Sequence, residues 1–74
     1  MFNLKLIGMK KYEIRRKDNG EIVATFPTEM KAIGWFHNHS SLSFNAALTY
    51  SDWDLFEVAE DGTEKKYMPY TYYL

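Results

Sequence analysis

The stretch KKYEIRRKDNGEIVATF, residues 10–26, gives the clearest indication of the fold. Its centre carries Asn19-Gly20, a pair typical of a tight hairpin turn because both residues tolerate the positive φ of a type I′ turn. Apolar and polar residues alternate on both sides of this pair, as in strands with one face in a core and one in water. We therefore predict a β-hairpin with strands at residues 10–17 and 21–26.

A second turn signal, Asp61-Gly62, lies in the C-terminal part of the chain. It separates residues 53–60 from residues 63–68 and predicts a second hairpin. Phe56 and Val58 lie among acidic residues, which is typical of a strand with one wet face, so we expect both to point into the core. The opposite face of this strand then carries Trp53, Leu55 and Glu57.

One helix is expected between the hairpins, at residues 29–37. Pro27 precedes it, and Thr28 is a good N-cap because its hydroxyl can accept an unpaired backbone N–H. Glu29 lies in the first turn, where the helix dipole favours a negative charge. The apolar face of the helix consists of Ala32, Ile33 and Phe36.

Residues 38–52 allow two interpretations. Leu42 and Phe44 alternate at a period of two, as in a strand. Phe44, Ala47 and Leu48 instead follow the i, i+3, i+4 spacing of a helix. The pattern does not decide between a short helix, a strand and a loop.

These elements predict one α+β domain over residues 1–74, with an antiparallel sheet of three to five strands and one helix on one face, in the order β-β-α-β-β. Residues 1–8 are expected to form an extra edge strand or a disordered arm. The expected core draws on both hairpins and the helix: Tyr12, Ile14, Ile22, Ala24, Phe26, Ala32, Ile33, Phe36, Phe56 and Val58.

The composition excludes several classes of protein. The chain has no cysteine, so neither a disulfide nor a thiolate metal site can stabilise this small domain. No stretch reaches the roughly 20 apolar residues of a membrane helix, and the N-terminal residues lack the apolar run of a secretory signal. We expect a cytoplasmic protein whose core depends on its 5 Phe, 6 Tyr and 2 Trp residues.

Basic and acidic residues are concentrated in different parts of the chain, although the net charge of the whole chain is only −1. Residues 1–17 contain six basic residues and one acid, a local net of +5, whereas residues 52–64 contain six acids and no base. If the two runs lie on adjacent strands, cross-strand pairs of about 0.2–1 kcal/mol each favour the pairing of those strands. We therefore interpret the separation as a strand-pairing feature rather than as a sign of polyanion binding.

No residue pattern indicates catalysis or metal binding. The chain lacks a Cys nucleophile and a Gly-rich phosphate loop, and no acid is identifiable that could orient a Ser–His pair. His37 and His39 point about 200° apart at a helix end, so they are not expected to share a metal. We predict a non-enzymatic protein without cofactor or metal.

Surplus aromatic residues make a protein-interaction module the leading hypothesis. Trp53 is flanked by two acids, and Trp is enriched at binding hot spots. Residues 67–74 contain four Tyr, and Pro69 predicts an edge strand or a lid across the sheet, through which the chain could also form a homodimer. The candidate protein-binding residues are Trp53, Leu55, Tyr70, Tyr72 and Tyr73.

A small nucleic-acid-binding protein is the alternative. The basic N-terminal hairpin could follow a phosphate backbone while an exposed aromatic side chain stacks on bases. The candidate residues for this function are Lys10, Lys11, Arg15, Arg16, Lys17 and Trp35.

Four parts of the sequence, KYEIR (11–15), DNGEIVATF (18–26), Glu29 and Ala32, resemble a known pattern. They look like the opening of small bacteriophage and prophage open-reading-frame products, which run β-hairpin, turn, helix and then further strands. The resemblance covers residues 10–37 and carries no functional residues across. It implies a viral accessory protein that binds a host or phage macromolecule.

Overall fold

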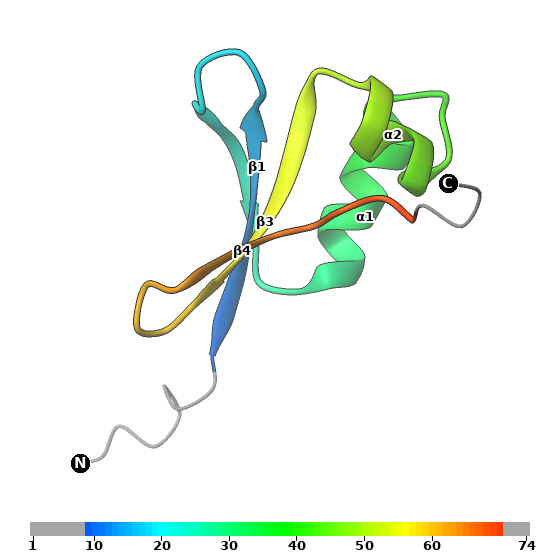
Figure 1. The fold of residues 1–74 in the computed structure, drawn as a ribbon. Helices are drawn as coiled ribbons and strands as arrows, with labels where there is room; N and C mark the ends of the chain where they lie inside the picture. Colours follow the sequence, from blue (N-terminus) through cyan, green and yellow to red (C-terminus); the bar gives the residue numbers. More distant parts are fainter. Residues whose placement is uncertain (1–8, 71–74) are drawn as a thin grey trace.

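The computed structural model describes residues 9–70 and contains a four-stranded antiparallel sheet and two helices (Figure 1). The α+β class and both hairpins are confirmed. Residues 1–8, for which we predicted an edge strand or an arm, lie outside the described residues. No helix within residues 9–70 is long and apolar enough to cross a membrane. The elements are β1 (Lys10–Arg16), β2 (Ile22–Phe26), α1 (Glu29–His39), α2 (Phe44–Tyr50), β3 (Trp53–Ala59) and β4 (Glu64–Lys66).

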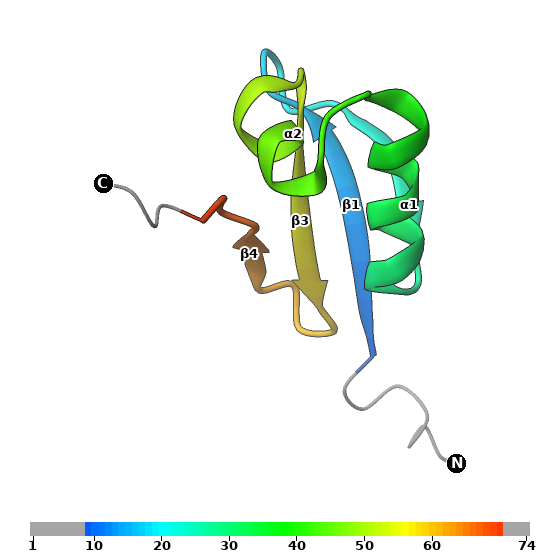
Figure 2. The ribbon, with the colours of Figure 1, turned by 90° about the vertical axis from the view of Figure 1, so that its right-hand side faces the viewer.

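The strand order is β2-β1-β3-β4, so the two hairpins meet through β1 and β3. Ile14 lies opposite Ala24 of β2 and opposite Leu55 of β3. Helix α1 packs on β1 and β2, and α2 packs on β3, as Figure 2 shows. The sheet therefore has two edges among the described residues, β2 on one side and β4 on the other.

The turn of the first hairpin is not of type I′. Gly20 has a φ of 77°, but no non-glycine residue in the described part of the chain has a positive φ, so Asn19 does not take the predicted conformation. Asn19 acts through its side chain, whose Oδ1 accepts the Glu21 N–H at 2.8 Å. The Arg16 N–H donates to the Glu21 carbonyl at 2.9 Å and closes the hairpin.

Hydroxyl caps begin both helices. The Thr28 hydroxyl accepts the Lys31 N–H at 3.3 Å, as the sequence predicted, and α1 continues to His39 rather than ending at His37. In the segment with two interpretations, the Ser43 hydroxyl accepts the Ala46 N–H at 3.3 Å, and α2 follows. The helical interpretation of residues 38–52 is therefore the correct one for their second half.

The core lies between the sheet and the two helices. Its largest fully buried side chains are Phe36 of α1, Ile14 of β1 and Leu55 of β3. Phe36 meets Phe44 of α2 edge to face, with ring centroids 5.5 Å apart. The remaining buried members are Ala32, Ala47 and Leu48, and the half-buried side chains packed against them include Tyr12, Ala24, Phe26, Trp35, Phe44, Trp53 and Tyr67.

The predicted orientation of β3 is wrong. Leu55, which we placed opposite the core, is fully buried within it, while Phe56 lies on the other face of the sheet. Val58 is also buried, but it lies on that same other face, opposite Lys11. Residues 53–58 carry apolar side chains on both faces of the strand, so their alternation alone does not select the core face. The pairing of Leu55 with the buried Ile14 selects it.

Two further core predictions fail on the first hairpin and the helix. Ile22 is 50 % exposed, because it lies where the pairing of β1 and β2 shifts register. Ile33 is only half-buried and does not belong to the core cluster. The other predicted core residues of these elements are buried or packed against the core: Tyr12, Ile14, Ala24, Phe26, Ala32 and Phe36.

Candidate interaction site

The predicted protein-binding residues of β3 are part of the folded interior. Leu55 has no exposed surface, so it cannot serve as a surface anchor in this fold. Trp53 is half-buried, and its ring meets that of Trp35 edge to face with centroids 5.0 Å apart. The structure therefore joins Trp53 to the core instead of presenting it to a partner.

Trp35 is engaged in the same cluster. Its ring stacks on His39 with centroids 3.9 Å apart and planes 13° from parallel, and His39 Nδ1 lies 2.8 Å from the Trp35 carbonyl. Trp35 is thus half-buried between two rings rather than the exposed stacking platform that the nucleic-acid alternative requires.

The C-terminal tail is fastened to the core through Tyr67. Its N–H donates to the Leu55 carbonyl at 2.9 Å, and its hydroxyl donates to Glu29 of α1 at 2.6 Å. Burial, together with the hydrogen bond to Glu29, raises the pKa of Tyr67 above its ordinary value. Farther along, the Tyr70 N–H donates to Asn45 Oδ1 at 2.6 Å, although the Tyr70 side chain is largely exposed. The other tail candidates, Tyr72 and Tyr73, lie outside the described residues.

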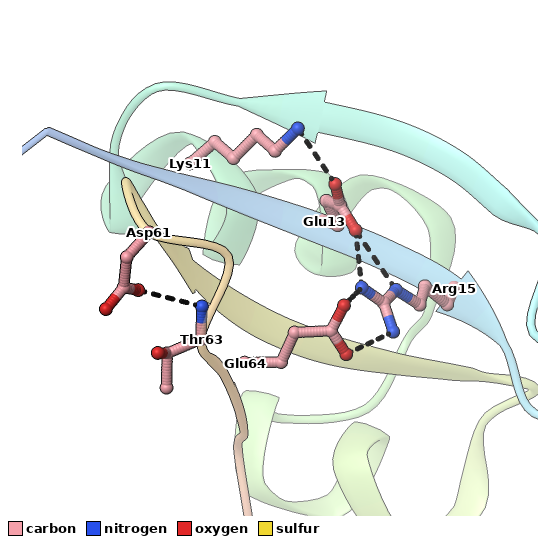
Figure 3. Close-up of polar contacts among 6 residues, drawn as sticks. All are labelled: Lys11, Glu13, Arg15, Asp61, Thr63 and Glu64. Carbon is pink, nitrogen blue, oxygen red and sulfur yellow. Dashed lines mark hydrogen bonds and ion pairs between the residues drawn. The ribbon is translucent and has the colours of Figure 1, made fainter.

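An ion-pair network covers the sheet face opposite the helices (Figure 3). The Arg15 guanidinium contacts Glu13 at 2.6 Å and Glu64 at 2.9 Å, and it lies 4.1 Å from the centre of the Phe56 ring. Lys11 contacts Glu13 at 3.3 Å, so this buried carboxylate has two cationic partners. The hydrogen bond with Arg15 lowers the pKa of Glu64 below its ordinary value.

The other basic residues of the predicted nucleic-acid site also have partners within the fold. Lys10 pairs with Glu57 of β3 at 2.5 Å, and Arg16 pairs with Asp18 at 2.7 Å. The Lys17 amino group donates to the Leu48 and Thr49 carbonyls, which lie at the end of α2 where unpaired carbonyls accumulate.

The adjacency of the basic and acidic runs is confirmed, because β1 pairs with β3 along their whole lengths. The Lys10–Glu57 contact joins the two strands directly. Arg15 lies opposite Asp54 of β3 but forms its ion pair with Glu64 of β4. Asp54 instead forms an ion pair with Lys66 of β4 at 3.6 Å. The charges therefore hold three strands together rather than two.

A cleft of about 510 Å³ is lined by both polar and apolar side chains, and its acids have partners. It lies between Glu29 of α1, Lys10 and Tyr12 of β1, Glu57 of β3, and Tyr67. Glu29 accepts the Tyr67 hydroxyl, and Glu57 pairs with Lys10. No group of three His, Cys, Asp or Glu side chains within residues 9–70 could hold a metal ion.

The two sheet edges differ in chemistry. Edge β4 has three residues, all charged and exposed, and two of them, Glu64 and Lys66, are in ion pairs. Edge β2 has five residues and no charge, and it exposes 50 % of Ile22 and 40 % of Val23. Its neighbour in the sheet is β1 alone, so its outer row of backbone groups has no strand partner among the described residues.

Edge β2 is also the surface that the sequence prediction missed. Its residues alternate in a way that fits an interior strand as well as an edge strand, and the strand order was not deducible. The one available signal was the composition of IVATF, which lacks the Lys, Glu or Pro that commonly protect an edge. We refer to Ile22–Phe26 as the β2 edge.

Comparisons of the chain with protein-family models, with curated proteins and with solved structures gave no match.

Proposed function

We propose that this chain is a non-enzymatic protein-interaction module that binds an extended strand of its partner along the β2 edge. The observation that carries the proposal is the contrast between the edges. Edge β4 is short and charged, whereas β2 is uncharged and, among residues 9–70, has a strand partner on one side only. Proteins commonly blunt exposed edges with charges, so an edge left uncharged is suited to strand addition.

Strand addition draws its affinity from the backbone. A partner strand forms main-chain hydrogen bonds with the outer row of the edge, while its side chains contact those of alternate residues. On the β2 edge, Val23 and Thr25 are exposed β-branched residues, which pack well on a neighbouring strand. The site therefore favours an extended apolar segment over a charged one.

The nucleic-acid alternative receives less support from the same structure. Every basic candidate residue has an acceptor within the fold, and Trp35 is stacked in the aromatic cluster. A phosphate backbone would have to compete with those acceptors for each basic side chain.

The proposal keeps the wider role that the sequence suggested. A cytoplasmic accessory protein of phage type would act by binding a host or phage macromolecule, and a strand-accepting edge suits that task because it tolerates varied side chains in the partner. The tail side chains Met68 and Tyr70, both 70 % exposed, would extend the contact surface only for a large partner, since they lie beyond β4.

Affinity capture tests the proposal with a matched pair of variants. Thr25→Lys places a charge on the β2 edge, and Thr63→Lys makes the same exchange at an exposed position next to β4. We expect nuclease-treated lysate to yield a partner that binds the wild type and Thr63→Lys but not Thr25→Lys. Equal capture by both variants, or capture that nuclease abolishes, would contradict strand addition at β2.

A further inference from the structure

We propose that the strand bound by the β2 edge is β2 of a second copy of this chain, antiparallel across a two-fold axis. The two four-stranded sheets then join into one continuous sheet. This inference rests on the proposed function and names its partner. A two-fold axis gives an isologous contact, in which the same edge serves both copies and the assembly closes at two.

Charge does not oppose self-pairing at this edge. In a two-fold antiparallel pair, the residue at the axis faces its own copy, and the residues before it face those the same distance after it. The β2 edge contains no charged residue, and the flanking Glu21 of each copy lies at opposite ends of the paired segment. The same operation at β4 places Lys65 opposite Lys65 and Glu64 opposite Lys66, but Glu64 and Lys66 already have ion-pair partners within their own sheet.

The residues of the β2 edge suit their own copies. With the axis at Thr25, Thr25 faces Thr25 and Ala24 faces Phe26, within the part of β2 that pairs regularly with β1. Paired threonines are favourable across strands. This position brings the two Thr25 side chains to facing sites, about 5 Å apart.

The length of the regular pairing sets the expected strength. Pairing of β2 with β1 is regular over Ala24–Phe26 and shifts register toward Ile22, and Pro27 has no N–H to donate. A contact of this length is small, and small interfaces bind weakly. We therefore expect a dissociation constant in the micromolar range, on the order of 10–100 µM.

Sedimentation of the full chain from about 5 to about 500 µM covers that range. The wild type and Thr63→Lys should shift from a mass of 8.8 kDa to twice that value, and Thr25→Lys should associate at least tenfold more weakly because the two lysines repel. A wild type that remains monomeric at the highest concentration overturns the proposal, as does equal association of the two variants. Circular dichroism confirms that each variant is folded.

Cross-linking locates the contact, since the chain has no cysteine of its own. A short bismaleimide should join Thr25→Cys chains at least tenfold faster than Thr63→Cys chains at equal concentration, because dimerisation raises the local concentration of the first pair. Equal rates would place the contact elsewhere and contradict pairing through β2.

The two experiments separate this inference from the proposed function. If the wild type is monomeric but Thr25→Lys still loses the captured partner, strand addition at β2 stands. Only the proposal that the partner is a second copy is then overturned. A monomeric wild type whose capture is unchanged in Thr25→Lys overturns both.

Discussion

The two edges of this sheet are built in opposite ways. Edge β4 is three charged residues long, is tied to β1 and β3 by Arg15 and Asp54, and continues into a tail that is fastened to the helices through Tyr67. The β2 edge is longer and uncharged, and it exposes Ile22 and Val23. Charge is thus concentrated on the half of the sheet where it holds strands together, and it is missing where a further strand could pair.

The difference shows what an ion-pair network can and cannot do in a small domain. The guanidinium of Arg15 spans β3 to reach Glu64 and covers the Phe56 ring on the way. Such a layer shields apolar side chains on a sheet face that no described helix covers. It also pairs Lys11 and Arg15, two basic residues of β1, with acids.

The largest loss of stability should come from a substitution in β3, which lies between the two edges. Leu55→Ala removes a fully buried side chain and should lower the free energy of unfolding by about 2–5 kcal/mol, whereas Ile22→Ala at the β2 edge should cost less than about 1 kcal/mol. Urea unfolding of both variants measures the difference. Similar losses would mean that Ile22 belongs to the core and that the β2 edge is not exposed.

The anchor of β4 should give the next largest effect. Tyr67→Ala removes a half-buried ring that lies against Phe44 and should cost about 2 kcal/mol, less than the loss for a fully buried aromatic residue. Tyr67→Phe keeps the ring and removes only the hydrogen bond to Glu29, so it should cost about 1 kcal/mol. If Tyr67→Ala is neutral in thermal unfolding, the tail does not hold the β4 edge.

Acid should weaken the β4 edge selectively. The hydrogen bond with Arg15 lowers the pKa of Glu64, so the folded state binds a proton there less readily than the unfolded state. This stabilisation is complete above the ordinary value of 4.5 and is lost as pH falls through the lowered pKa. The melting temperature should be steady between about pH 7 and pH 5 and then fall, with a shallower fall in Glu64→Gln.

Equal slopes in the wild type and Glu64→Gln would show that Arg15 does not hold Glu64 in solution. Asp61 provides a second acid on the same hairpin, because the Thr63 N–H lowers its pKa as well. Asp61→Asn therefore serves as a companion variant whose slope should also decrease.

The smallest effect should be that of salt on the β2 edge. The strand Ile22–Phe26 has no charge, so raising the salt concentration tenfold should change its association by less than about twofold. Nucleic-acid binding through the basic hairpin would instead weaken by orders of magnitude over the same range. Sedimentation in low and high salt distinguishes the two.

Local turn and cap chemistry made much of the fold predictable. Asn19-Gly20 and Asp61-Gly62 located the hairpins, and Thr28 located the start of α1. The type of the first turn was not predictable, because a side-chain hydrogen bond from Asn19 replaces the expected backbone conformation.

The candidate site depended on information that is not local. Phe56 and Val58 fitted the core face of β3 as well as Trp53 and Leu55 did, so the sequence assigned the latter pair to the surface. Only the pairing of Leu55 with Ile14 shows which pair faces the core. The β2 edge became recognisable only from the strand order, which places β1 rather than β2 beside β3.

Hydrogen exchange of the backbone amides tests most directly whether the β2 edge accepts a strand. Rates measured residue by residue at about 50 µM and about 500 µM protein report strand pairing as protection that increases with concentration. We predict that alternate amides within Ile22–Phe26 gain protection at the higher concentration while those of Glu64–Lys66 do not. Rates in β2 that are independent of concentration, or a gain confined to β4, would contradict pairing at the β2 edge.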